Sequence, residues 1–150
     1  MPSLSSSISK GAVGVCFSTA ITAESRQFGL NAANAIGAAY EVPENLMSAI
    51  TGVSGSGIAY AFAFIHGIAM GGVRSGLPYT TALAVAIDMT IGAAELLRHT
   101  GSHPQSMIAS VCSPAGTTIE GLYALENGRF TALCMDAVTA ASQKSQELES

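Results

Sequence analysis

Charged side chains are scarce in this sequence. Asp, Glu, Lys and Arg make up 11% of the 150 residues, whereas an ordinary soluble domain has about 25%. Hydrophobic residues account for 49% of the chain, which excludes an intrinsically disordered protein, because disordered chains are poor in apolar residues. A surface with so few charges needs either a membrane or a large interface with another chain to cover it.

Basic residues and cysteines are also few. The formal net charge is −4, and the six Lys and Arg are scattered, so no stripe exists to neutralise the phosphates of a nucleic acid, and we expect no nucleic-acid partner. Cys16, Cys112 and Cys134 are far apart and form no metal-ligand spacing. We interpret the three cysteines as small hydrophobes in a reducing compartment and expect no metal site.

No apolar run combines the length and the composition of a membrane span. The apolar stretch at residues 58–73 contains a histidine and three glycines and is shorter than the roughly 20 residues that a spanning helix needs. The next stretch, residues 77–97, carries Asp88 near its middle, and the Ser-rich N-terminus predicts no secretory signal. We expect a cytoplasmic oligomer without a membrane span; a small membrane protein is a third, separate alternative to the two functions given below.

The local patterns predict a mainly α chain with a β-containing start. Residues 11–17 and 38–42 are candidate strands, the second ended by Pro43. Thr22 is a predicted N-cap, and a Gly/Ser turn at 54–57 is predicted before an apolar helix that should be buried all round. The predicted helices are residues 23–36, a helical stretch from Glu44 onward with Leu46, Met47 and Ile50 on one face, and residues 58–73, 80–99, 104–111, 118–126 and 130–148.

Two loops could bind a ligand. The Gly-rich stretch 51–57 lacks the Lys of a P-loop and a preceding strand, so it either binds an anion through backbone N–H groups or lets helices pack closely. The stretch 112–118 is either an ordinary helix N-terminus or a carboxylate site formed by the N–H groups of Gly116 and Thr117, with one more hydrogen bond from Thr118. We interpret His66 as a hydrogen-bonded core histidine, and His99 and His103 as surface residues.

Several motifs follow one another along the chain. They are Thr-Gly-Val-Ser-Gly-Ser-Gly-Ile-Ala-Tyr at 51–60, Gly-Val at 72–73, Gly-Leu-Pro at 76–78, Gly-Ala-Ala-Glu-Leu-Leu at 92–97, His-Pro at 103–104, Ser-Pro-Ala-Gly-Thr-Thr at 113–118 and Lys-Ser-Gln-Glu-Leu at 144–148. As a set, these motifs resemble the pyrroline-5-carboxylate reductase family. The resemblance implies that residues 1–42 are the tail of a Rossmann domain. It implies that residues 43–150 are an all-α dimerisation domain of the type found at the C-terminus of 6-phosphogluconate dehydrogenase.

The family reduces the ring imine of pyrroline-5-carboxylate to proline with a hydride from NADPH or NADH. The resemblance implies a homodimer or higher oligomer of interlocked helices, with the substrate or proline held on the 113–118 loop. The implied site residues are Ser113, Ala115, Gly116 and Thr117 for the carboxylate, Thr118 as the catalytic residue at the ring nitrogen, and Val111 and Cys112 beside the nicotinamide.

The sequence departs from the family pattern at several positions. Ile58 replaces a proline, His66 and Met70 stand where acidic residues are common, and Ser3 replaces an asparagine. Ala115 replaces a glycine in the carboxylate loop, which would strain the loop if the position needs a positive φ.

No Gly-x-Gly-x-x-Gly segment follows a predicted strand. We therefore expect a fragment of a reductase that neither binds NADPH nor catalyses alone. The alternative is a stand-alone module that pairs with a full-length reductase.

Overall fold

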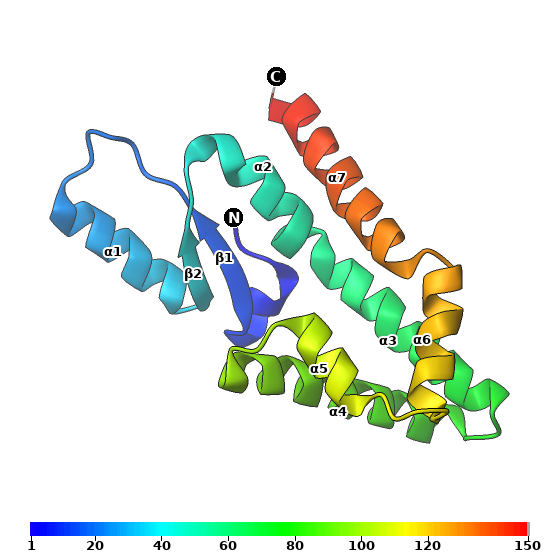
Figure 1. Ribbon diagram of the computed structural model, residues 1–150. Helices are drawn as coiled ribbons and strands as arrows, with labels where there is room; N and C mark the ends of the chain where they lie inside the picture. Colours follow the sequence, from blue (N-terminus) through cyan, green and yellow to red (C-terminus); the bar gives the residue numbers. More distant parts are fainter. Residues whose placement is uncertain (150) are drawn as a thin grey trace. The chain divides into compact units, whose positions relative to one another are not determined.

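The computed structural model describes residues 1–149, and the chain divides into two compact units (Figure 1). The first unit comprises Met1–Tyr60 together with the stretch that begins at Ala132, and the second unit is Ala61–Thr131. Helices predominate in both units, and the two strands lie in the first. The predicted mainly α fold class is therefore confirmed.

The first unit opens with a β–α–β arrangement. After a 3-10 helix at Leu4–Ile8, strand β1 (Gly11–Val15) leads through helix α1 (Ala23–Asn34) to strand β2 (Gly37–Glu41). The strands pair in parallel, from Gly11 opposite Gly37 to Val15 opposite Glu41. Crossover through a helix is the usual way to join parallel strands. Both predicted strands are confirmed, each with slightly different ends.

The start of α1 has the predicted cap. Thr22 Oγ1 accepts a hydrogen bond from the Ser25 N–H at 3.2 Å, and Glu24 lies in the first turn. This pairing satisfies one of the N–H groups that a helix start leaves without an intrahelical partner.

Strand β1 is largely buried within the first unit. The side chain of Val13 is buried, and the neighbouring Gly14 lies directly against the Ile50 side chain of the helix that follows β2.

The predicted turn at 54–57 is wrong, because the backbone there is helical. A 3-10 helix at Glu44–Leu46 is followed by α2 (Met47–Ile50), a π-helix at Thr51–Gly55 and α3 (Gly57–Arg74). The Ser56 N–H donates to the Thr51 carbonyl at 2.9 Å, the i to i+5 bond of a π turn. The Thr51 and Ser54 hydroxyls each donate to a carbonyl four residues earlier, so both are hydrogen-bonded within the helix.

The glycines of this stretch serve packing at one position in particular. Gly52 is buried, and a Cβ there would lie 2.3 Å from Ser142 Oγ and 2.7 Å from the Val138 carbonyl oxygen. Both contacts belong to α7 (Phe130–Glu149), whose Ala137 carbonyl also accepts the Tyr60 hydroxyl hydrogen bond at 3.1 Å. Of the two interpretations of the 51–57 stretch, close helix packing is confirmed at this glycine.

The second unit is built from helices with a small core. It contains most of α3, then α4 (Tyr79–Thr100), α5 (Pro104–Val111) and α6 (Thr117–Asn127). Ala69 of α3 packs against Ala82 and Ala86 of α4, with Ile65 and Leu83 partly buried around them. Small side chains at this contact allow the two helix backbones to approach closely.

The apolar surface of the helices is largely uncovered within the chain. Of the α3 residues, all of which the structure describes, only Ala69 is buried, whereas Phe62 and Met70 are about half exposed. His66 is exposed as well and lies edge-on to the Tyr79 ring, with the ring centroids 6.4 Å apart. Within the single chain, therefore, α3 is not buried all round and His66 is not a core histidine.

Two helical stretches are long and apolar enough to cross a membrane. They are Glu44–Arg74 and Tyr79–Thr100, with 6% and 11% of their apolar windows buried. The first stretch is longer than the expected apolar run at residues 58–73, because the π-helix continues the helix toward the N-terminus. Length and composition are weak evidence for a membrane span here, since apolar helices that pack inside a soluble assembly have the same properties.

Candidate functional site

The predicted site residues lie together where α5 ends and α6 begins. Val111 is the last residue of α5 and is 62% exposed, and Cys112 caps that helix with its N–H on the Ala109 carbonyl. Gly116 then occupies the N-cap of α6. The structure therefore places the whole predicted set on a single short connection, in the second unit.

A tight turn forms the centre of this connection. The Gly116 N–H donates to the Ser113 carbonyl at 3.0 Å, with Pro114 and Ala115 in the two middle positions. Ala115 has a φ of 56°. A proline followed by a positive φ is typical of a type II turn, whose third residue favours glycine. The turn thus holds Ala115 in the left-handed region, where alanine is strained.

Gly116 is needed for a different reason. Its φ is −80°, which any residue can adopt, but a Cβ at this position would lie 2.3 Å from Ser113 Oγ. A side chain at this position would require the Ser113 hydroxyl to rotate away and would leave a tight contact of 3.0 Å with the Ser113 carbonyl oxygen. Because the Gly116 N–H is bonded to the Ser113 carbonyl, a carboxylate could reach it only by sharing that hydrogen bond.

The start of α6 offers further donors. Within the described residues, no side chain caps this helix N-terminus, and first-turn N–H groups have no partner inside a helix. Thr117 and Thr118, the first two residues of the helix, are exposed. The positive end of the helix dipole favours an anion there, although Glu120 in the same turn opposes it.

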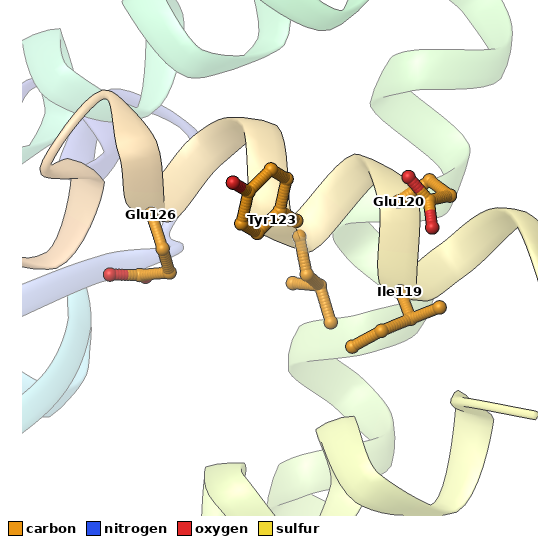
Figure 2. A pocket seen from close by; sticks show the side chains of 5 residues that line it. Ile119, Glu120, Tyr123 and Glu126 are labelled. Carbon is orange, nitrogen blue, oxygen red and sulfur yellow. The ribbon is translucent and has the colours of Figure 1, made fainter. Parts of the chain in front are cut away.

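Two hollows near this connection were missed by sequence reasoning. One lies on α6 itself and is lined by Ile119, Glu120, Leu122, Tyr123 and Glu126 (Figure 2). Its two carboxylates make it unsuited to an anion. The other is an apolar groove between α4 and α5 that reaches Val111; its lining residues are Ala93, Leu96, Leu97, Pro104, Met107, Ile108 and Val111. The spacing of the lining residues along each helix could have indicated that they share one face, but not that this face is hollow.

Metal chemistry finds no support in this geometry. In residues 1–149, no group of three or more His, Cys, Asp and Glu side chains is placed to hold a metal ion. His103 instead accepts the Gln105 N–H at the start of α5, through Nδ1 at 3.2 Å. Its role in the described structure is that of a helix cap.

Comparison with known proteins gives a consistent result. The family model described as pyrroline-5-carboxylate reductase dimerisation matches residues 44–148. Pyrroline-5-carboxylate reductase of Methanosarcina acetivorans is 40% identical over 148 residues, which are 99% of this chain and 55% of that protein. The Arabidopsis thaliana enzyme is 39% identical over 99% of this chain and 54% of its own length.

Solved structures agree with the sequence comparison. A pyrroline carboxylate reductase of Plasmodium falciparum with NADP bound is 28% identical, with a TM-score of 0.94, over 100% of this chain and 62% of that chain. The Streptococcus pyogenes enzyme is 26% identical with a TM-score of 0.93, over 98% of this chain and 57% of that chain. The chain spans about half the length of the curated relatives named here, and it belongs to the pyrroline-5-carboxylate reductase family, with the dimerisation domain at residues 44–148.

Proposed function

We propose that this chain is the substrate-binding and dimerisation portion of a cytoplasmic pyrroline-5-carboxylate reductase. The family reaction is the reduction of 1-pyrroline-5-carboxylate to L-proline by NADPH or NADH. We assign residues 1–42 to the tail of the cofactor domain and residues 43–150 to the helical domain. The observation that carries the proposal is the 113–118 connection, where the family motif forms a tight turn directly before an uncapped helix N-terminus.

The substrate carboxylate binds at this connection. The exposed residues Ser113 and Thr117 would supply a hydroxyl and a backbone N–H, and Ala115 and Gly116 hold the turn that presents them. Thr118 lies next along α6, where its hydroxyl can reach the ring nitrogen once the carboxylate is held. These groups orient the substrate rather than attack it, which is how proteins contribute to hydride transfer.

The residues present do not fit the pyrophosphate of a dinucleotide. The connection from β1 to α1, residues 16–22, contains no glycine, and the Thr22 hydroxyl already occupies the start of α1. Dinucleotide folds need glycines at such a turn, so that the backbone can approach the phosphates. Val111 and Cys112 could border a nicotinamide, but holding the cofactor requires residues outside this chain.

A homodimer accounts for the apolar surface of the helices. Large hydrophobic side chains such as Phe62 and Tyr123 are more than half exposed, and a second copy would remove this surface from water. The alternative is pairing with a full-length reductase. Because the β1–α1 connection of this chain does not fit a dinucleotide, an active complex would need the cofactor site of such a partner.

Three measurements on the purified chain test the proposal. Analytical ultracentrifugation should show a dimer, and a well-folded monomer at micromolar concentration would contradict it. NMR titration with proline should move the amide signals of Gly116 and Thr117, with a dissociation constant in the millimolar range, or roughly −4 kcal/mol. Shifts confined to other regions would overturn the site assignment.

The third measurement is NADPH oxidation at saturating pyrroline-5-carboxylate. We expect no turnover above the background without protein. Turnover that Thr118→Val abolishes would show that the chain forms a complete site unaided. Addition of a full-length reductase subunit, inactivated in its own Thr-Thr motif, tests the alternative function, because activity would then require the two chains to pair.

A further inference from the structure

We propose that Ala115 is a positioning residue that sets how strongly the 113–118 connection binds a carboxylate. This inference rests on the proposed function. Three residues other than glycine have a positive φ in the described structure: Ser9, Ala115 and Arg129. Ser9 and Arg129 follow the ends of helices, where a left-handed residue is common. Ala115 precedes a helix instead, so its backbone needs another explanation.

The surroundings of Ala115 keep it in the left-handed region. Pro114 has its φ fixed by its ring, and the Gly116 N–H is bonded to the Ser113 carbonyl at 3.0 Å. Gly116 also packs closely against Ser113, so a Cβ at this position would lie 2.3 Å from its Oγ and 3.0 Å from its carbonyl oxygen. Rotation of Ala115 to a negative φ would break the turn and redirect Gly116, which is the N-cap of α6.

The consequence concerns the donors at the start of α6. Gly116 leads directly into Thr117 and Thr118, so the direction of their N–H groups depends on the turn. A residue with a Cβ resists the left-handed region, and chains whose turn has opened cannot present these donors. The measured affinity falls in proportion to the fraction of molecules that hold the binding conformation. Ala115 thereby weakens carboxylate binding relative to glycine without any contact to the ligand.

Three substitutions separate conformation from size. Ala115→Gly relieves the strain and should raise proline affinity by up to about tenfold, because the left-handed penalty is worth a factor of order ten and the gain is limited to the fraction of parent molecules whose turn is open. Ala115→Asn is larger than alanine but tolerates the left-handed region, so it should also bind more tightly than the parent chain. Ala115→Val is stiff and β-branched and should bind more weakly.

The experiment is an NMR titration of the dimeric full chain with proline, with hydrogen exchange of the Gly116 amide in the absence of ligand. We expect the affinity order Gly and Asn above Ala above Val, and slower exchange in Ala115→Asn, because the Ser113 bond is formed more often. Ser9→Gly is the matched control, since it relieves a φ of 55° far along the chain and should leave proline affinity unchanged.

The outcomes are distinguishable. Weaker binding by Ala115→Asn than by the parent chain would overturn the inference and indicate a steric effect, while the proposed carboxylate site would stand. Absence of proline binding by every folded variant, the parent included, would contradict the proposed function itself. If Ala115→Val fails to fold, the comparison of Asn with Ala still decides the question.

Discussion

Replacement of Gly52 by alanine probes the contact that holds the π-helix against α7. The alanine Cβ would lie 2.3 Å from Ser142 Oγ and 2.7 Å from the Val138 carbonyl oxygen. The serine hydroxyl can rotate away, but the carbonyl belongs to the backbone of α7 and can move only with the helix. We therefore expect Gly52→Ala to force the two helices apart.

The magnitude follows from two opposing effects. Overpacking of a close contact costs about 1–3 kcal/mol, whereas alanine in a helix is about 1 kcal/mol better than glycine. We expect a net loss of up to about 2 kcal/mol in the free energy of unfolding. Adding Ser142→Ala should recover part of the loss, because it removes the nearer contact and leaves the carbonyl of Val138 in place.

Gly55→Ala is the matched control within the same π-helix. The nearest atom to its Cβ would be a Thr51 methyl carbon at 3.6 Å, an ordinary contact, so this variant should be equal to the parent chain or more stable. Urea unfolding followed by circular dichroism measures both variants, at one fixed protomer concentration because dimer stability depends on it. Equal stability of Gly52→Ala and Gly55→Ala would refute the reasoning.

Three further substitutions test individual hydrogen bonds and one ion pair. Thr22→Ala removes the N-cap of α1 and should cost about 1 kcal/mol in urea unfolding, whereas Thr22→Ser should cost little; equal losses would show that the cap contributes nothing. Glu41→Gln breaks the ion pair between Glu41 and Arg26, whose side chains are 35% and 49% exposed, respectively, and should lower the free energy of unfolding by less than about 1 kcal/mol. A loss that is the same in molar salt would argue against an ionic contribution. Tyr60→Phe removes a hydroxyl that donates to a carbonyl of α7 and should cost about 0.5–1.5 kcal/mol, and an unchanged urea midpoint would contradict a role for that bond.

Local signals predicted the ends of several helices correctly. Thr22 begins α1 through its side-chain oxygen, Pro104 opens α5, and Gly101 ends α4 with a φ of 62°. Each of these residues acts through its own backbone or through neighbours within a few positions, so the sequence alone contains the necessary information.

The Gly/Ser stretch differs from its predicted turn because the deciding contact is distant in sequence. Glycine and serine favour turns when only neighbours are considered. Here Gly52 packs against Ser142, ninety residues further along the chain, and this contact favours a continuous helix. A single sequence does not reveal such a pairing.

The exposure of His66 and the backbone of Ala115 show two other limits. Apolar periodicity indicates that α3 is to be covered, but not whether the cover comes from the same chain, and His66 is exposed here. From the sequence, Ala115 is expected to be strained only if its φ is positive. Its φ is set by the turn that the hydrogen bond between Gly116 and Ser113 closes, and a single sequence does not reveal this turn. The clustering of the site residues, by contrast, follows from their adjacency in the chain.

The π-helix at Thr51–Gly55 also bears on the tolerance of this segment to a change in length. Each residue of an α-helix turns the chain by about 100°, and a π turn holds one residue more than an α turn. Deletion of one residue between 51 and 55 would convert the segment to regular α-helix and leave all that follows in nearly the same rotational position, because the extra residue of the wide turn is the one removed. Tyr60 would then still face its carbonyl on α7. A single-codon deletion here should therefore be better tolerated than the same deletion within the regular helix of α3, where every later residue would rotate by about 100°.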